Sequence, residues 1–230
     1  MKFALITPPQ FAGTLLSRGL GYHFVLAQHL NDLRYLATYQ FLKKRGHFIM
    51  LDNGAAEMGQ SMSVLSLEKA YRQLEPDEVI LPDVLGDSVG TLTRTHEAVH
   101  RFPKTKRAMV PQGETWAKWT DCLERMVEWG CTTICVPKLY EAYDGGRFKA
   151  LSIIQMHHWE WDHNVHLLGC YDSPTKEIKR IAKFYPWVRG IDTAAPFAYA
   201  QAEMSVDCTE HVSLDWDSRE EAVYPKLIRK

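Results

Sequence analysis

Residues 48–59 read FIMLDNGAAEMG, and this stretch decides how the remaining chain is interpreted. Four apolar residues lead directly into Asp52, Asn53 and Gly54, a carboxylate followed by two residues that favour turns. A short, continuous apolar run is typical of a strand that is buried on both faces, as in a parallel sheet. An aspartate at the end of such a strand either caps the following helix or faces a substrate. The other strand ends of the chain decide between these two roles.

Apolar runs of the same kind recur along the chain, and amphipathic segments of about a dozen residues separate them. Buried strands that alternate with such helices indicate parallel strands joined by right-handed crossovers. Seven or eight of these units, without a glycine-rich dinucleotide-binding motif, predict an α/β fold of the (β/α)8 TIM-barrel type rather than an open doubly wound sheet. The predicted strands are residues 3–7, 47–51, 78–82, 107–111, 132–137, 165–169 and 188–192, with a weaker eighth candidate at 211–216.

The composition is that of an ordinary globular protein, with 230 residues of which 46% are hydrophobic and 24% are charged. This length suits one domain, and no linker, repeat or low-complexity tract divides it, so we expect residues 1–230 to form a single barrel domain. No apolar run reaches the roughly 18–20 residues that cross a bilayer. The apolar segment in MKFALITPPQ is too short for a signal peptide, so we expect a cytoplasmic protein that does not associate with membranes.

Cysteines and histidines give no clear metal site. An odd number of cysteines without regular spacing argues against a disulfide framework, and Cys131 and Cys135 lack the second pair that a structural zinc site needs. Residues 157–166, HHWEWDHNVH, hold four histidines, and we favour an exposed connection into a strand over a metal site there. We therefore expect no metal and no cofactor. The five cysteines are Cys122, Cys131, Cys135, Cys170 and Cys208.

The charged residues nearly balance, with a net charge of −1. Proteins that bind nucleic acid through phosphate contacts usually have more basic than acidic residues. Any such contact in this protein therefore depends on a local cluster of basic residues. The basic run RFPKTKR at residues 101–107 precedes a predicted strand, so it belongs on the face of the barrel opposite the strand ends. We interpret that run as a solvated turn.

Polar residues and glycines stand at the ends of successive predicted strands. In a barrel, all C-terminal strand ends lie on one face, where the catalytic sites of such enzymes are built. Helix capping explains any one of these aspartates but not the whole set on a single rim. The residues concerned are Asp52, Asn53, Gly54, Asp83, Gln112, Gly113, Lys138, Leu168, Gly169 and Asp192.

Two carboxylates that face one pocket permit glycosidic chemistry. One attacks the anomeric carbon and holds a covalent intermediate, while the other moves the proton of the leaving and entering groups. A third carboxylate and a glutamine amide offer the acceptor and the donor that read the hydrogen-bonding edge of a purine. Glycines at the strand ends allow a flat ring to approach the backbone closely.

The order of these strand ends resembles that of the tRNA-guanine transglycosylases. Each motif is short, but five occur in the same order over roughly residues 47–200. The resemblance implies that Asp192 is the nucleophile and Asp52 the general acid/base, in a base exchange without metal or cofactor. It also implies a base-binding slot formed by Asp83, Gln112, Gly113, Asn53, Gly54, Leu168 and Gly169. The matching segments are LDNGAAE, LPDVLGD, VPQGE, HLLGCYDSP and RGIDTAAP.

The chain departs from this family in several places. The zinc-binding segment, which helps the tRNA enzymes engage RNA, is missing, because the tail after Asp192 holds only Cys208. Ala56 stands where an aromatic residue would cover the base, Val136-Pro137-Lys138 replaces a Gly-Gly stretch, and APFAYA replaces a Pro-Thr-Arg run.

A compact barrel without zinc resembles the phage-associated DpdA-type transglycosylases, which exchange guanine in DNA for a 7-deazaguanine such as preQ0. We therefore expect a DNA transglycosylase, in the host cytoplasm if the chain is phage-encoded. Three alternatives remain: the same exchange on tRNA, a nucleoside or glycoside hydrolase, and a non-catalytic nucleic-acid-binding partner subunit. A homodimer is also open, because barrels of this kind often pair.

Basic residues near the predicted strand ends are candidates for binding nucleic acid. The long first loop, residues 8–30, is a candidate for covering the pocket or supporting a flipped nucleotide, because the anomeric carbon is inaccessible in a stacked duplex. The alternative is that residues 22–30, YHFVLAQHL, form a helix that packs on the barrel. The candidate nucleic-acid-binding residues are Arg18, Lys138, Arg147, Lys149, Lys176 and Lys179.

Overall fold

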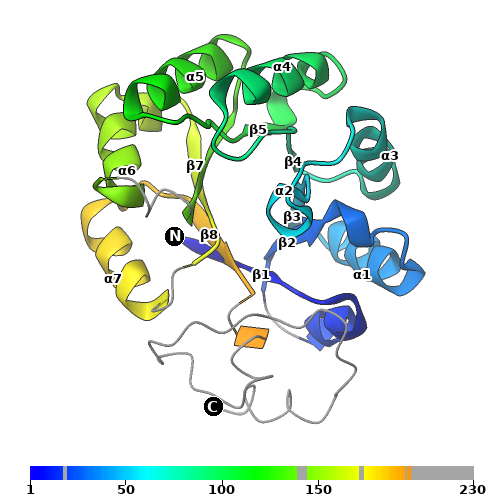
Figure 1. Ribbon diagram of the computed structural model, residues 1–230. Helices are drawn as coiled ribbons and strands as arrows, with labels where there is room; N and C mark the ends of the chain where they lie inside the picture. The colour runs from blue at the N-terminus through cyan, green and yellow to red at the C-terminus, as the bar shows by residue number, and fades with distance from the viewer. Residues whose placement is uncertain (18–19, 139–143, 171–173, 195, 198–230) are drawn as a thin grey trace.

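Eight parallel strands close into a barrel and follow one another around it in the order of the sequence (Figure 1). The computed structural model of the chain describes residues 1–17, 20–138, 144–170, 174–194 and 196–197. The last strand pairs with the first in parallel, with Asp192 beside Ala4, so the sheet has no free edge. The strands are β1 Lys2–Ile6, β2 Tyr22–Leu26, β3 Phe48–Asp52, β4 Glu78–Ile80, β5 Arg107–Met109, β6 Thr133–Pro137, β7 Asn164–Leu168 and β8 Gly190–Thr193.

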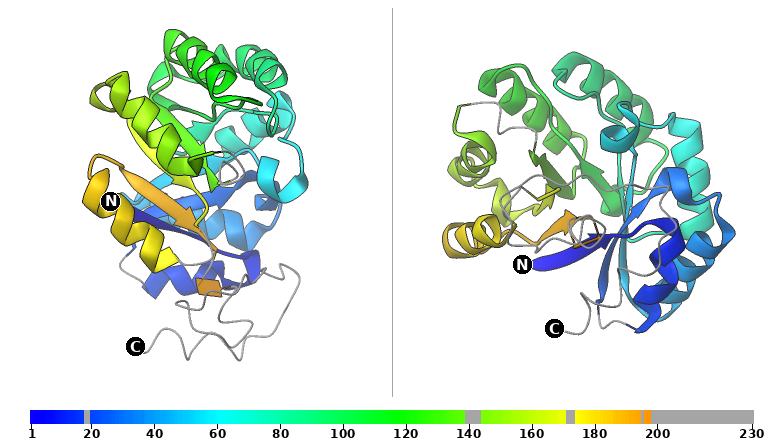
Figure 2. Two further views of the ribbon diagram at one scale, coloured as in Figure 1. Left: turned by 60° about the vertical axis from the view of Figure 1, so that its left-hand side comes forward. Right: turned by 60° about the horizontal axis from the view of Figure 1, so that its bottom comes forward.

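Helices surround the barrel on its outer side (Figure 2). No helix within the described residues is long and apolar enough to cross a membrane. The α-helices are α1 Leu33–Lys44, α2 Ala55–Met58, α3 Val64–Leu74, α4 Ser88–Val99, α5 Trp116–Glu128, α6 Gly146–Met156 and α7 Pro174–Phe184. The 3-10 helices are η1 Pro9–Ser17, η2 Ala27–His29, η3 Lys104–Lys106 and η5 Trp159–Trp161.

The (β/α)8 barrel and its seven main strands are confirmed, but the sequence interpretation missed β2. Residues 22–26 were assigned to a covering loop or a packed helix, whereas they form a strand in which all five residues are buried. A run that is apolar throughout gives no period by which a strand is told from a helix, which explains the error. The weaker candidate at 211–216 lies outside the described residues.

Two apolar layers stabilise the barrel, one inside it and one between the strands and the helices. In β2, Phe24 and Leu26 belong to the inner layer, while Val25 belongs to the outer layer with Leu51 and Trp119. Successive side chains of a strand point to opposite faces, so strands buried on both sides contribute to both layers. The strand ends and the loops after them are therefore where polar side chains gather on the C-terminal face.

Candidate active site

Asp52 ends β3 at the C-terminal face of the barrel, with only 7% of its surface exposed. Its Oδ2 accepts the backbone N–H of Gly54 at 2.7 Å, which folds the chain sharply after the strand. Gly54 has a φ of 77°, and a Cβ there would lie 2.6 Å from Met58 and 2.8 Å from Gln28. Glycine is therefore required at this position, and the turn directs the chain into the short helix α2.

Asp83 follows β4 and is held on both oxygens by side-chain amides. Asn53 donates from Nδ2 to Oδ1, and Gln112 donates from Nε2 to Oδ2, each at 2.8 Å. The backbone N–H of Gly86 in turn donates to Gln112 Oε1 at 3.1 Å. Asp83 is 3% exposed and both amide side chains are 1% exposed. Three successive strand ends thus form one fixed polar unit.

Asp192 in β8 is 2% exposed and also accepts a hydrogen bond on each oxygen. His166 of β7 lies 2.9 Å from Oδ1 through its Nε2, and the backbone N–H of Gly169 donates to Oδ2 at 3.0 Å. Gly169 has a φ of 69°, which favours glycine, and this conformation turns its N–H toward the carboxylate. The strand end after β7 thereby positions the carboxylate of β8.

The carboxylates of these strand ends act on one another electrostatically. Burial raises the pKa of Asp52 well above its usual value, the charge of Glu57 raises it further, and Asp192 and Asp83 add smaller effects in the same direction. The hydrogen bond from Gly54 opposes these effects in part. Because a carboxyl group with a raised pKa keeps its proton toward neutral pH, Asp52 is suited to act as an acid.

Asp83 and Glu57 also have raised pKa values. Burial raises the pKa of Asp83, while the hydrogen bonds from Asn53 and Gln112 lower it in part. Protein atoms crowd the carboxyl group of Glu57 and raise its pKa although the residue reaches the surface, and Asp192 adds to this effect while Lys138 opposes it. Acidic groups from β3, β8 and the short helix α2 therefore converge on one mouth of the barrel.

Helix capping does not account for Asp52 or Asp83. The N-cap of α2 is Gly54, and those of α3 and α4 are Ser63 and Asp87, whose side chains accept backbone N–H groups of the first turn. The two strand-end aspartates lie before these caps and take part in polar contacts of the rim instead. Neither Asp52 nor Asp83 is therefore the N-cap of α2, α3 or α4.

Several predicted base-binding residues have clear structural contacts. A Cβ on Gly113 would lie 2.5 Å from the backbone nitrogen of Trp119, so this glycine allows α5 to approach the end of β5. Leu168 is partly buried and packs against the apolar layer inside the barrel, directly before Gly169. Asn53 and Gln112 hold Asp83, as described above. The structure thus brings the predicted carboxylates and their neighbours to one rim.

Arg147 does not fit the predicted role in binding nucleic acid. It is completely buried, and its guanidinium forms an ion pair with Glu177 at 2.6 Å. It also donates to the carbonyl oxygens of Leu168 and Gly169 at 2.6 and 2.9 Å. Arg147 therefore fixes the turn that presents the Gly169 N–H to Asp192, and no phosphate can reach it.

The other predicted basic residues differ in position. Lys138 is exposed at the end of β6, and its side chain lies over Gly169. Lys149 is partly buried in α6, with its ammonium 5.6 Å from the centre of the Trp116 ring. Lys176 and Lys179 are exposed on α7, whereas Arg18 lies outside the described residues.

Sequence reasoning missed Glu57 and His166 as members of the site. Glu57 carried a signal, because it follows the strand-end motif within the segment quoted first. His166 was considered only as a metal ligand, because the histidines before it dominated the pattern. Within the described residues, no group of three or more histidines, cysteines or acidic residues is arranged to hold a metal. The histidines at 157 and 158 instead stack on Trp159 and Trp161.

Comparison with known proteins identifies the fold but no family. No protein-family description and no curated protein matches the sequence. Phosphoenolpyruvate phosphomutase from Streptomyces platensis subsp. rosaceus is 11% identical, with 88% of this chain and 79% of that chain covered and a TM-score of 0.58.

N-acetylneuraminate lyase from Mycoplasma synoviae is also 11% identical, over 88% of this chain and 74% of that one, with a TM-score of 0.51. The carboxyl transferase domain of Rhizobium etli pyruvate carboxylase is 12% identical over 85% and 40% of the two chains, with a TM-score of 0.52. At such low identity the similarity concerns the barrel alone.

Proposed function

We propose that the protein is a glycosyltransferase that exchanges guanine in DNA for a 7-deazaguanine base of the preQ0 type. One observation carries this proposal: Asp52, held toward its protonated form, interacts electrostatically with Asp192, whose two oxygens are held by hydrogen bonds. One acid suited to donate a proton and one carboxylate suited to attack carbon are what a double displacement at an anomeric centre needs. The order of strand-end motifs, which resembles the tRNA-guanine transglycosylases, adds independent support.

In the first half of the reaction, a carboxylate oxygen of Asp192 attacks C1′ of a deoxyguanosine. The bond between C1′ and N9 breaks, and protonated Asp52 supplies the proton that the departing guanine takes up. A covalent glycosyl-Asp192 ester remains, and Asp52 is left ionised. In the second half, Asp52 removes the N9 proton of the entering 7-deazaguanine, whose N9 then attacks C1′ and displaces Asp192.

Base recognition is assigned to the polar unit around Asp83. Its carboxylate offers acceptors to the N–H groups of a purine edge, and Gln112 offers an amide beside it. The two amides that hold Asp83 keep its oxygens in one orientation before the base arrives. Leu168 and Gly169 border the slot on the side of Asp192.

DNA is the favoured partner because the chain lacks the zinc-binding segment that helps the similar tRNA enzymes engage RNA. The target nucleotide has to leave the duplex stack to expose C1′, so the backbone needs support near the barrel mouth. Lys138, Lys149, Lys176 and Lys179 remain candidates for phosphate contacts, and so does Arg18, which lies outside the described residues.

The decisive experiment offers labelled guanine and preQ0 to the protein together with DNA or tRNA, and follows the base into nucleosides by mass spectrometry. We expect incorporation into DNA. Incorporation into tRNA would move the activity to that substrate, release of free base without incorporation would indicate a hydrolase, and binding without either reaction would indicate a partner subunit.

Asp192→Ala should abolish the covalent adduct between protein and nucleic acid, because the attacking oxygens are removed. Denaturing electrophoresis of stopped reactions measures the adduct, and Asp121→Ala, at an exposed position of α5, is the matched control. An adduct that forms in the Asp192→Ala variant would contradict the assignment of the nucleophile.

A further inference from the structure

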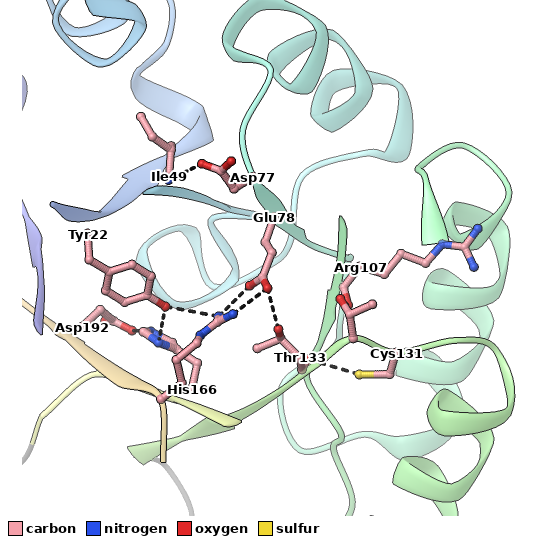
Figure 3. A network of polar contacts seen from close by, with 11 residues as sticks. Tyr22, Ile49, Asp77, Glu78, Arg107, Cys131, Thr133, His166 and Asp192 are labelled. Carbon is pink, nitrogen blue, oxygen red and sulfur yellow. Dashed lines mark hydrogen bonds and ion pairs between the residues drawn. The ribbon is translucent and has the colours of Figure 1, made fainter. Parts of the chain in front are cut away.

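A chain of polar side chains crosses the interior of the barrel and ends at Asp192 (Figure 3). Glu78, the first residue of β4, accepts two hydrogen bonds of 2.6 Å from Arg189 and one of 2.8 Å from Thr133. Arg189, directly before β8, also donates to the hydroxyl oxygen of Tyr22 at 3.2 Å. The buried carboxylate of Glu78 is thus paired with the partly buried guanidinium of Arg189, which offsets part of the cost of removing the two charges from water.

The other part of this chain of side chains connects Tyr22 to the candidate nucleophile, Asp192, through the imidazole of His166. The Tyr22 hydroxyl lies 2.9 Å from His166 Nδ1, and His166 Nε2 lies 2.9 Å from Asp192 Oδ1. Neither the proposed reaction nor the motif comparison assigns a role to Tyr22, His166 or Arg189. All six residues of the chain, Thr133 included, lie in or next to strands, so their backbones are held by the sheet.

Packing fixes the orientation of the His166 ring. Phe24 stacks on one side of it, with ring centres 5.7 Å apart and planes 10° apart, and Tyr22 approaches it edge-on. Gly190 leaves room for both rings, because a Cβ there would lie 2.8 Å from the Tyr22 ring and 3.3 Å from His166 Nδ1. The imidazole therefore has little freedom to flip or rotate.

The donors and acceptors of this chain favour one direction of hydrogen bonding. A guanidinium has donors and no acceptor, so Arg189 must donate to the Tyr22 oxygen. The single proton of Tyr22 is then free to point at His166 Nδ1, which in a neutral imidazole protonated on Nε2 accepts it. Burial also raises the pKa of Tyr22 well above its usual value, which keeps this hydroxyl protonated. Nε2 is left as the nitrogen that carries hydrogen, and it donates to Asp192.

We propose that His166 is a positioning residue, locked as its Nε2–H tautomer by Arg189 and Tyr22, that presents a fixed donor to Asp192. Its importance for catalysis rests on the proposed function of Asp192 as the nucleophile. With His166 on Oδ1 and Gly169 on Oδ2, the carboxylate is held in one rotamer. Arg189 cannot release a proton to this chain, and Asp52, the proposed proton donor for the departing base, is not part of it.

The tautomer is measurable without any substrate. In protein labelled with nitrogen-15 histidine, long-range nitrogen–proton spectra distinguish a protonated ring nitrogen from an unprotonated one, and the spectrum of His166→Gln identifies the His166 signals. We expect Nδ1 unprotonated and Nε2 protonated at neutral pH. A His166 that carries its proton on Nδ1, or that populates both tautomers, would overturn the inference.

Tyr22→Phe should allow His166 to change tautomer, because His166 Nδ1 loses its hydrogen-bond donor while every charged group is retained. We expect both tautomers of His166 in this variant, and a single Nε2–H tautomer in Tyr71→Phe, a control in α3 outside the barrel interior. Arg189→Lys retains a residue that only donates, so it should keep the wild-type tautomer. Circular dichroism checks that each variant is folded, and unchanged His166 signals in folded Tyr22→Phe would contradict the role of Tyr22.

The catalytic consequence is tested with the rate of adduct formation in a single turnover. Tyr22→Phe and His166→Leu should slow it by about 10-fold to 100-fold with little change in KM, the range typical for residues that orient a reacting group. His166→Gln should recover much of the rate, since its amide N–H can reach the position of Nε2. Wild-type rates in both slowed variants would reject the positioning role.

These measurements separate the inference from the proposed function. If the wild-type protein forms no adduct with DNA or tRNA, the base-exchange proposal fails. The locked tautomer is still supported in that case, provided that nitrogen-15 spectra find it in the wild type and find it lost in Tyr22→Phe.

Discussion

The raised pKa of Asp52 affects the stability of the protein as well as its proposed role as an acid. The pKa of Asp52 is higher in the folded protein than in the unfolded chain. At a pH above the unfolded pKa, Asp52 is ionised in the unfolded chain, so folding must either bury this charge or take up a proton. Asp52 therefore opposes folding at neutral and higher pH, and this opposition disappears as the pH falls and the unfolded chain also becomes protonated. Such costs are common at catalytic groups with strongly shifted pKa values.

Asp52→Asn should therefore stabilise the protein while it abolishes the proposed base exchange. Asparagine has no charge to bury, and its oxygen can still accept the Gly54 N–H that Asp52 accepts. We expect a gain in the free energy of unfolding of about 1–2 kcal/mol at pH 8 that shrinks toward pH 5, measured by urea denaturation. Asp121→Asn should show no comparable gain, and a loss of stability in Asp52→Asn at pH 8 would contradict the interpretation.

His23 carries a pH effect of the opposite sign. Burial, together with the neighbouring His47, lowers its pKa to about 4, and it is completely buried. A lowered pKa means that its contribution to stability is complete above the unfolded value near 6.5 and is lost as the pH falls toward 4. Between pH 7 and pH 5 this loss amounts to roughly 2 kcal/mol, at about 1.4 kcal/mol per pH unit.

His23→Gln removes this titration and keeps a group that can bond to His47. We expect the free energy of unfolding of the variant to fall less steeply from pH 7 to pH 5 than that of the wild type. His100→Gln, at an exposed position, is the control and should follow the wild-type curve. Identical slopes for His23→Gln and wild type would show that His23 does not carry the effect.

At the residue scale, the pattern of strand ends predicted Asp83 together with its partners Asn53 and Gln112, but it did not predict His166 as the partner of Asp192. Asp52, Asp83 and Asp192 were predictable because each follows an apolar run directly. Arg147 was assigned wrongly, because its distance from the strand does not reveal that the side chain turns inward to Glu177. His166 lay within the predicted strand 165–169, but the sequence does not show which distant side chains it meets inside the barrel, so its contact with Asp192 was missed.

At the element scale, the missed strand β2 explains why the polar contacts inside the barrel were not predicted. Tyr22 begins this strand, and without a strand there its hydroxyl could not be placed inside the barrel. The element that meets it is β8, where Gly190 leaves the space that the Tyr22 ring occupies. Pairing between β1 and both of these strands brings them together.

Gly190→Ala tests this close approach. The added methyl group would lie 2.8 Å from the Tyr22 ring and 3.0 Å from the Lys2 carbonyl oxygen, so the strands or the ring must shift. We expect a loss of about 1–3 kcal/mol in the free energy of unfolding, the usual cost of overpacking a rigid core. In the control Gly21→Ala, the methyl group meets nothing within 4 Å, so equal losses in both variants would contradict the steric explanation.

For the whole molecule, the barrel was predictable from the sequence and its interior was not. Alternating apolar strands and helices determine the class of fold, because few architectures bury parallel strands on both faces. The interior chain depends on contacts between distant residues: Glu78 and Arg189 are 111 positions apart, and Tyr22 and His166 are 144 apart. Patterns within a short window hold no information about such pairs.

The pairing of β8 with β1 has a consequence during protein synthesis. The strand that bears Asp192 leaves the ribosome after the other seven, so no shorter nascent chain can form the hydrogen bonds that hold this carboxylate. Until that strand docks, β1 and β7 each have an unpaired row of backbone groups, to which strands of other chains can pair. Premature termination before residue 190 would therefore yield a fragment that lacks Asp192 and is prone to aggregate through these two edges.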